Sequence, residues 1–406
     1  MFTRSGLCVV TCILALSYAT FAQEPIQFRA DAQHTGVYRT ATPEGQTYIK
    51  WRFRTGNKVR STPAVYGGMV IFGSNDGSLY AVDEATGTQR WAFKTGGPVS
   101  SSPAVADGTA YFQSADGKFY AVDAHTGKPR WTFALGKELP FRNGIAPTDL
   151  GPPDYGLWDF FLSSATLADG LVYFGGADGK LYALNARTGK QAWSFSTAGR
   201  VRSTPAVASG VVYFGSMDGN FFALDAKSGA LKWKFKTVGN EYFPAGEIQS
   251  SATVVDGTVY FGSRDYYVYA LDTATGALKW KMQHKDSWVV GSPAISDGLL
   301  FVGSSDAKFV QALDIKTGEE KWHEKTGGNV FASAAVAGNK VYFGDWDGTL
   351  LWRDSKTGRV LGGFLAEDRI NGSPVVNNGV IYIGVDDDCL YAIAAKPKTT
   401  NGAATK

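Results

Sequence analysis

The chain has 406 residues, a formal net charge of +3 and no block of basic residues. A nearly balanced charge without an RNA-binding signature argues against a nucleic-acid partner. Apolar residues make up 44% of the chain, enough for a large core, and the many glycines and aromatic residues suit an all-β protein with tight turns.

Residues 1–22 have the pattern of a secretory signal peptide. Arg4 supplies a positive start, the apolar stretch Leu7–Ala19 is too short to span a membrane comfortably, and small residues precede Gln23. A lipid anchor would need a cysteine at the cleavage point, whereas Cys12 lies inside the apolar stretch. We therefore expect an exported protein without a transmembrane segment. It would lie in the periplasm, free or at the outer membrane, or be secreted.

One repeated unit organises the rest of the chain and is clearest in residues 203–235. Two apolar runs, Val211–Phe214 and Phe221–Leu224, flank the turn Asp218-Gly219. A short run, Ser203–Val207, precedes them, and a second turn leads to Leu231–Phe235. Runs of β-branched and aromatic residues separated by such turns predict an antiparallel meander of four strands.

Eight such units follow one another at a spacing of roughly 40 residues, as in propeller blades. The aspartate of the central turn is present in all eight, at Asp76, Asp116, Asp178, Asp218, Asp265, Asp306, Asp347 and Asp387. A tryptophan marks the last strand of six units, at Trp91, Trp131, Trp193, Trp233, Trp280 and Trp322, and Gly362 takes its place in the seventh.

The eighth unit has only three strands, and a single strand around Trp51 precedes the first unit. A chain that begins with the final strand of its last unit closes a ring, which removes exposed sheet edges between the first and last units. We therefore predict an all-β fold: one eight-bladed propeller over residues 23–395, followed by a disordered tail at 396–406. The protein is expected to be a monomer.

The repeated columns have structural explanations. The aspartates lie one per blade on separate turns and are expected to bond their own turns, not a metal ion. Small hydroxyl residues begin each inner strand, where eight strands crowd the axis. The tryptophans are expected to pack between blades.

The unit V-Y-F-G-S-x-D-G-x-L/F-Y-A-L/V-D-A-x-T-G-x-x-x-W-x-F resembles the PQQ-type (pyrroloquinoline quinone) propeller repeat over nearly the whole mature chain. This repeat occurs in quinoprotein dehydrogenases and in non-catalytic relatives such as the outer-membrane assembly lipoprotein BamB. A single propeller without extra domains is more similar to the second group. The resemblance thus implies a protein-binding scaffold of the cell envelope that needs no cofactor.

The resemblance leaves a quinoprotein dehydrogenase, with PQQ and Ca²⁺ oxidising an alcohol or a sugar, as the alternative. Many such enzymes have a vicinal cysteine pair, but the mature chain keeps only Cys389. Their calcium ligands, an aspartate base and a haem motif match no position here. We therefore expect no catalytic residues and no metal site.

The candidate binding face lies where the repeat is interrupted, because loops carry function on a rigid scaffold. Two long connections between blades, 136–162 and 238–249, carry aromatic residues and lie on the same face as the Asp-Gly turns. The predicted face comprises Arg60, Phe141, Arg142, Tyr155, Trp158, Arg202, Tyr242, Phe243, Arg264, Trp288 and Trp346. A protein partner is expected there.

Two further interpretations remain open for this face. Arg60 and Arg202 are expected at the channel mouth, where they could bind the carboxylate or anion of a small ligand, or simply pair with nearby acids. The aromatic insertions could contact a partner, or pack as a lid on the disc.

Overall fold

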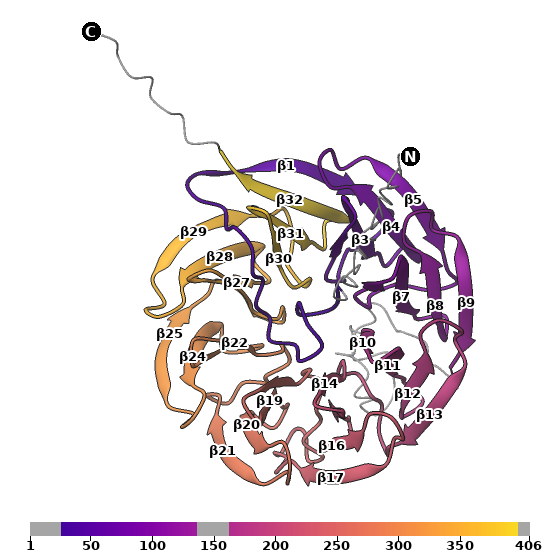
Figure 1. Cartoon of the computed structure of the whole chain (residues 1–406). Helices are drawn as coiled ribbons and strands as arrows, with labels where there is room; N and C mark the ends of the chain where they lie inside the picture. The colour runs from indigo at the N-terminus through magenta and orange to yellow at the C-terminus, as the bar shows by residue number, and fades with distance from the viewer. Residues whose placement is uncertain (1–25, 136–161, 397–406) are drawn as a thin grey trace, which may run out of the picture.

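The computed structural model describes residues 26–135 and 162–396, and in this part of the chain every regular element is a β-strand. The strands form eight four-stranded antiparallel sheets arranged around a central axis (Figure 1). The predicted eight-bladed propeller is confirmed. The signal peptide and the C-terminal tail lie outside the described residues and stay predictions.

In each blade the four strands lie side by side, and the order given below is from the channel axis to the rim of the disc. Blade 1 contains β2 (Ala64–Tyr66), β3 (Met69–Gly73), β4 (Ser78–Asp83) and β5 (Gln89–Lys94); blade 2 contains β6 (Ala104–Ala106), β7 (Thr109–Ser114), β8 (Lys118–Asp123) and β9 (Pro129–Ala134). Blade 3 contains β10 (Thr166–Ala168), β11 (Leu171–Gly175), β12 (Lys180–Asn185) and β13 (Gln191–Ser196); blade 4 contains β14 (Ala206–Ala208), β15 (Val211–Gly215), β16 (Asn220–Asp225) and β17 (Leu231–Lys236).

The second half of the chain continues in the same way. Blade 5 contains β18 (Thr253–Val255), β19 (Thr258–Gly262), β20 (Tyr267–Asp272) and β21 (Leu278–Gln283); blade 6 contains β22 (Ala294–Ser296), β23 (Leu299–Gly303), β24 (Phe309–Asp314) and β25 (Glu320–Lys325). Blade 7 contains β26 (Ala335–Ala337), β27 (Lys340–Gly344), β28 (Thr349–Asp354) and β29 (Val360–Leu365); blade 8 contains β30 (Val375–Asn377), β31 (Val380–Gly384) and β32 (Cys389–Ala395).

Blade 8 is completed by β1 (Thr47–Arg54), which pairs antiparallel with β32. The register places Trp51 opposite Ala392 and Tyr48 opposite Ala394. The two ends of the propeller therefore share one sheet (Figure 1), and the ring closes as predicted.

The tryptophans of the outer strands join neighbouring blades. Each indole N–H donates to a main-chain carbonyl of the next blade at 2.9–3.0 Å, and each ring lies against a turn glycine there. The seven contacts pair Trp51 with Gly87, Trp91 with Gly127, Trp131 with Gly189, Trp193 with Gly229, Trp233 with Gly276, Trp280 with Gly318 and Trp322 with Gly358. The predicted packing between blades is confirmed.

Blade 7 departs from this pattern because the next blade offers no such turn. The outer turn of blade 8 would lie between β32 and β1, which are the two ends of the propeller chain. Gly362 replaces the tryptophan, and its partner across the ladder is Trp352, where the other blades have alanine. A Cβ on Gly362 would lie 2.5 Å from the Trp352 ring, so the large side chain has moved to the neighbouring strand.

We expect Gly276→Ala to destabilise the protein more than Gly257→Ala. Both glycines have positive φ, at 71° and 70°, so both substitutions carry the cost of a left-handed alanine, about 1–2 kcal/mol. At Gly276 the new Cβ would also lie 2.7 Å from the Trp233 ring, whereas at Gly257 the nearest atom is 3.9 Å away. Overpacking should add about 1–3 kcal/mol. Denaturant unfolding of the two variants measures the difference, and equal losses would contradict the packing role.

Residues 26–42, here called the hub segment, run around one end of the central channel and bind the inner strands in order (Figure 1). Ile26 exchanges two main-chain hydrogen bonds with Val105 of blade 2, and the Gln27 side chain accepts from Leu167 of blade 3. The carbonyls of Ala32, Gln33, Thr35, Gly36 and Ala41 accept from Val207, Val254, Ile295, Val336 and Gly379, in blades 4 to 8. The segment thus bonds the inner strands of blades 2 to 7 and the turn between β30 and β31 of blade 8.

Two buried polar side chains hold the hub segment on the axis. Arg29 donates to the carbonyls of Ala334 (2.7 Å) and Pro293 (2.5 Å), in blades 7 and 6. The His34 ring bonds the Ala252 carbonyl (3.2 Å) and the Thr166 hydroxyl (3.1 Å), in blades 5 and 3. Burial lowers the pKa of Arg29 to about 10 and that of His34 to about 3. At neutral pH the arginine is therefore charged and the histidine is neutral.

Candidate functional site

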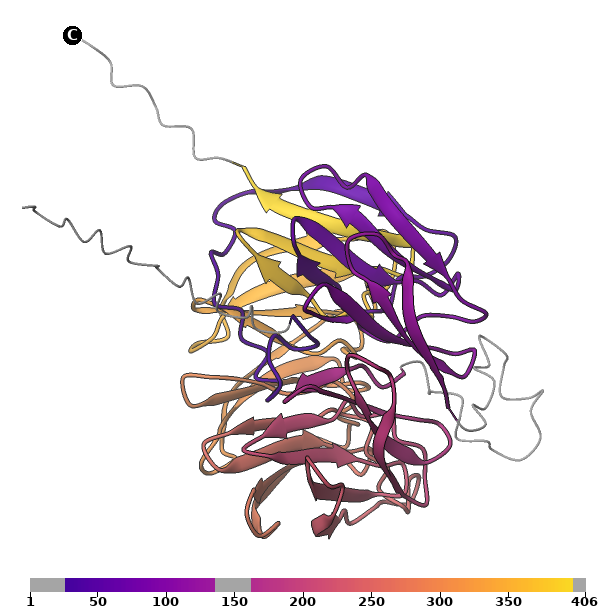
Figure 2. The same cartoon turned by 45° about the vertical axis from the view of Figure 1, so that its right-hand side comes forward.

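The hub segment lies on one face of the disc (Figure 2). The opposite face, here called the mouth face, carries the central turns and the connections between blades, and the channel opens there. One residue from the start of each inner strand lines the opening, as predicted: Arg60, Ser100, Leu162, Arg202, Gln249, Val290, Phe331 and Asn371. Below them lies a ring of hydroxyl residues: Thr62, Ser102, Ser164, Thr204, Ser251, Ser292, Ser333 and Ser373.

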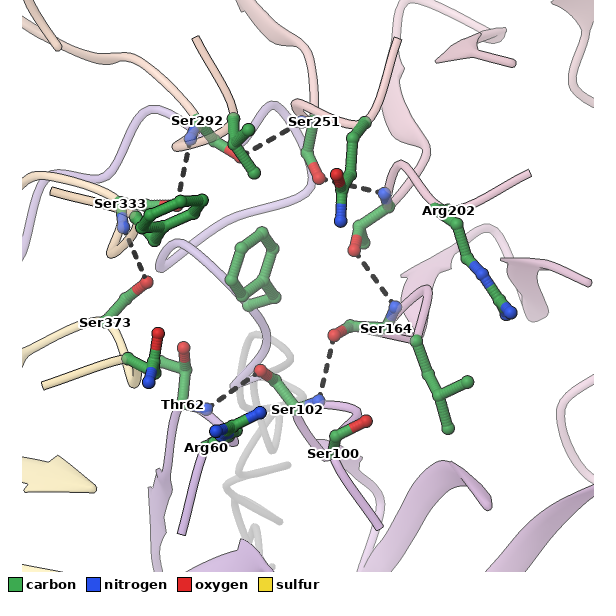
Figure 3. Close-up of a pocket in the computed structure, with 17 residues that line it drawn as sticks. Arg60, Thr62, Ser100, Ser102, Ser164, Arg202, Ser251, Ser292, Ser333 and Ser373 are labelled. Atoms are coloured by element: carbon green, nitrogen blue, oxygen red, sulfur yellow. Dashed lines mark hydrogen bonds between the residues drawn. The ribbon is translucent and has the colours of Figure 1, made fainter. Parts of the chain in front are cut away.

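The hydroxyl ring also forms hydrogen bonds between neighbouring blades. The main-chain N–H of each of seven members donates to the hydroxyl of the next blade, at 2.8–3.0 Å, from Thr62 to Ser102 and onward to Ser373 (Figure 3). These bonds satisfy inner-edge amides that would otherwise lack a strand partner. The ring therefore ties the eight blades together below the mouth.

The channel is a shallow well and not a pore. Phe28 of the hub segment lines the same space as the hydroxyl ring, and the volume of this space is about 60 Å³. A cavity needs roughly 10–15 Å³ for each water by this measure, so the well holds a few waters and is too small for a sugar ring.

Arg60 pairs with an acidic residue of the neighbouring blade 8, as one of the two interpretations predicted. It donates to both carboxylate oxygens of Asp386, at 3.0 and 2.7 Å, and the Asp386 side chain is fully buried. Burial would raise the pKa of this carboxyl, but the bonds from Arg60 and the charge of Lys58 lower it. The pair is thus a buried bidentate contact that fixes the Arg60 side chain at the mouth.

Arg202 lies at the mouth but is not exposed. Only 4% of its surface is accessible, and its side chain points away from the channel axis (Figure 3). Arg60 and Arg202 therefore do not converge on one ligand position.

A second arginine cluster lies on the mouth face between blades 4 and 6. Arg264 is 1% exposed, and its guanidinium lies 5.3 Å from the centre of the Phe243 ring and 5.5 Å from that of Trp288. The two rings meet edge to face at 4.8 Å, and Arg264 donates to the Gln249 side chain at 2.6 Å. Arg264 therefore supports the aromatic surface from below, and Trp288 is the partly exposed member.

Glu247 belongs to this cluster and was not among the predicted site residues. It is 7% exposed, its pKa is raised by burial, and its main-chain carbonyl accepts from the Arg264 N–H at 3.0 Å. It lies in the second predicted insertion, but its sequence context did not distinguish it from the exposed acid Glu241. Burial of a carboxyl in a non-repetitive connection has no periodic signal.

A third cluster lies over blades 7 and 8. Trp346 stacks on Phe331 with ring centres 4.4 Å apart, and its indole N–H donates to the Asn371 side chain at 2.8 Å. The guanidinium of the exposed Arg369 lies 4.8 Å from the centre of the same ring. Trp346 is therefore in contact with a phenylalanine, an arginine and an asparagine at the mouth.

The predicted face is therefore distributed as follows. Arg60, Arg202, Phe243, Arg264, Trp288 and Trp346 lie around the mouth, and Tyr242 projects beside them with 63% of its surface exposed. Phe141, Arg142, Tyr155 and Trp158 lie outside the described residues.

A family profile described as outer membrane protein assembly factor BamB matches residues 35–151, 156–266 and 240–401. This covers most of the chain. The protein belongs to this BamB family of PQQ-type propellers. The predicted resemblance is confirmed at the level of the family.

Solved structures share the fold of this BamB-family chain at low identity. BamB from Moraxella catarrhalis superposes with a TM-score of 0.71 at 19% identity, covering 86% of this chain and 100% of that one. A europium-containing methanol dehydrogenase gives 0.75 at 14% identity, covering 91% and 98%. The quinohemoprotein alcohol dehydrogenase from Comamonas testosteroni gives 0.73 at 13% identity, covering 93% and 81%. No curated protein matches the chain by sequence.

The described residues of this BamB-family propeller do not fit the quinone and calcium of the dehydrogenase alternative. In residues 26–135 and 162–396, no group of three potential metal-binding side chains comes together, and Cys389 is the only cysteine. The turn aspartates are committed locally: Asp76 accepts from the Gly56 N–H (2.9 Å) and the Tyr80 hydroxyl (2.8 Å). The well is also too small for a tricyclic quinone. We therefore derive no redox step from this site.

A second cavity, of about 720 Å³, opens on the hub side between the hub segment and the inner strands β2 and β30. Its Asp31 carboxylate already accepts from the Thr35 amide at 3.0 Å.

Among the described residues there is no helix with the length and apolarity needed to cross a bilayer.

Proposed function

We propose that this protein is a non-catalytic scaffold of the cell envelope that binds a protein partner on its mouth face. The family description, an outer membrane assembly factor, supports an extracytoplasmic role in assembly. The predicted signal peptide is consistent with export. Fold similarity alone does not choose between scaffold and enzyme, because the solved neighbours include both kinds.

The observation that carries the proposal is the pair of fixed arginine–aromatic clusters at the mouth. Trp288 and Trp346 are each partly exposed, and each lies against an arginine and a phenylalanine. The Trp346 indole N–H is also held by the Asn371 side chain. Tryptophan, tyrosine and arginine dominate the energetic centres of protein interfaces, and rings that are already immobile lose little entropy on binding. Trp288, Trp346 and Tyr242 are the expected contact residues.

Site-specific photo-crosslinking in cells tests the face. A photoreactive phenylalanine analogue at Tyr242 should give a discrete adduct with an envelope protein. The same analogue at Tyr48, which is 41% exposed at the start of β1 and away from the mouth, is the matched control and should give none. Adducts at Tyr48 but not at Tyr242 would show that the partner binds elsewhere.

Once the partner is known, Trp346→Ala should weaken its binding by about 2 kcal/mol or more, roughly thirtyfold. The affinity of the purified pair can be measured by calorimetry. Unchanged thermal unfolding of Trp346→Ala would separate lost contact from lost fold. An affinity within twofold of the wild type would exclude the blade 7 cluster from the interface.

The dehydrogenase alternative has its own test. Titration of the mature protein with PQQ in the presence of Ca²⁺ should release no heat of tight binding if the proposal holds. One-to-one binding, together with reduction of an electron-accepting dye by an alcohol or a sugar, would overturn it.

A further inference from the structure

The outer strands of the blades form the rim of the disc, where one edge of each sheet is free (Figure 1). Three alternating positions of each outer strand, aligned on the tryptophan, carry at least two polar side chains in seven blades. The sets are Arg90, Ala92, Lys94; Arg130, Thr132, Ala134; Ala192, Ser194, Ser196; Lys232, Lys234, Lys236; Lys279, Lys281, Gln283; Lys321, His323, Lys325; and Lys50, Arg52, Arg54.

Blade 7 is the exception at all three positions. Its outer strand β29 has Leu361, Gly363 and Leu365 there. Leu365 is 70% exposed and Val360, at the start of the strand, is 48% exposed. Charged side chains, lysine above all, keep free sheet edges from pairing with other chains. β13 of blade 3 also has no charge at these positions, but it keeps the polar Ser194 and Ser196. β29 is the outer strand with neither a charged nor a polar side chain at any of the three positions.

The main chain of β29 offers a regular set of free hydrogen-bonding groups. The Ala366 N–H donates inward to the Gly348 carbonyl at 2.8 Å. Because the two sides of an antiparallel strand alternate, Phe364 and Gly362 also face β28, and the N–H and C=O groups of Gly363 and Leu365 point away from the blade. An added strand would bond these outward groups.

We propose that β29 pairs with β29 of a second copy of this chain, forming a two-fold symmetric dimer through a continuous sheet. The register that joins outward groups places Gly363 opposite itself on the two-fold axis. Leu365 then lies opposite Leu361 of the second copy, and Gly362 lies opposite its Phe364. The sequence of the strand is therefore self-complementary, with apolar side chains meeting across the axis and no side chain on it. This replaces the expectation of a monomer.

The neighbouring blades do not oppose this contact strongly, because their rim charges are paired within the chain. Arg52 of blade 8 binds Glu367 at 2.5 Å, and His323 of blade 6 bonds Glu320 at 2.6 Å. The contact is small, however: stable complexes usually bury about 800 Å² per partner, more than a six-residue strand provides. The dimer is therefore weak and reversible, and depends on protein concentration.

Sedimentation velocity of the mature protein over a wide concentration range tests the proposal. The wild type should shift from monomer to dimer as concentration rises. Leu365→Lys should remain monomeric, and the fold accepts lysine there because Lys94 occupies the same position in blade 1. Gly363→Lys should also remain monomeric. Lys234 occupies its position in blade 4, but in blade 7 the new Cβ would lie 2.8 Å from the end of the Leu351 side chain, which has to move. Leu231→Lys is the matched control: it removes an apolar residue 48% exposed on the rim of blade 4, and should still dimerise.

Three results would overturn the proposal: a wild type that stays monomeric at the highest concentration, a dimer that survives both β29 variants, or a series of larger species that does not end at the dimer. Thermal unfolding of each variant confirms that it is folded. None of these outcomes depends on the partner of the mouth face.

Discussion

Acidification from pH 7 to pH 4.5 is expected to lower the free energy of unfolding by about 4–5 kcal/mol, because two histidines are buried without charge. Burial lowers the pKa of His34 to about 3, and the same cause lowers the pKa of His284 to about 3. His34 faces the charged Arg29, and His284 bonds the Gln311 side chain at 2.6 Å. Protonation of either ring in the folded chain is therefore unfavourable until the pH falls to about 3.

Stability decreases on acidification because the unfolded chain binds more protons than the folded chain. Below the ordinary histidine pKa of about 6.5, the unfolded chain binds a proton at each ring, whereas the folded chain does not until about pH 3. Stability is therefore complete above pH 6.5 and falls by about 1.4 kcal/mol per pH unit for each ring as pH decreases toward 3. The carboxyls of Glu247, Asp306 and Asp345 have raised pKa values and oppose part of this loss.

Urea unfolding at a series of pH values measures the slope. His34→Gln should lower stability at pH 7 but reduce the slope between pH 6 and 4.5 by about half. The same substitution at the exposed His125, whose ring stays in contact with water, should leave the slope unchanged. A His34→Gln slope equal to that of the wild type would show that this ring does not control the acid response.

The propeller fold could be predicted from sequence because its blades repeat. A spacing near 40 residues, the Asp-Gly turns and the tryptophan column recur with the period of the blades, so the strands predicted in one blade supported those predicted in the next. The lone strand around Trp51 had no other role than to complete blade 8. Even the departure at Gly362 was visible, although its cause, the absence of an outer turn in blade 8, needs the closed ring to be understood.

The hub segment could not be predicted in the same way, because it occurs once. Arg29 reaches carbonyls 264 and 305 residues away, and His34 contacts residues of blades 3 and 5. Contacts between a side chain and a distant main chain leave no periodic trace in a single sequence. The burial of Arg202 and Arg264 was hidden for the same reason: sequence placed them at the mouth but could not show which neighbours cover them.

Arg29→Ala is expected to destabilise the protein by about 3–5 kcal/mol. The substitution removes a side chain 2% exposed and leaves the buried carbonyls of Pro293 and Ala334 without their donor. An unsatisfied buried polar group costs about 1–3 kcal/mol, and the lost volume adds to this. Arg39→Ala, in the same segment but exposed, is the matched control and should change stability by less than about 0.5 kcal/mol.

Removing the hub segment altogether should have a larger effect than Arg29→Ala. A mature chain that lacks residues 26–42 loses the main-chain bonds to the inner strands of blades 2 and 4–7 and to the turn at Gly379 in blade 8, as well as Arg29 and His34. At about 1 kcal/mol for each bond, the loss is comparable with the whole net stability of a typical domain, about 5–15 kcal/mol. The truncated chain should therefore unfold well below the wild-type melting temperature, and a synthetic peptide of residues 26–42 should raise that temperature while a scrambled peptide should not. A truncated chain that melts with the wild type would show that the blades hold the ring without the segment that spans their axis.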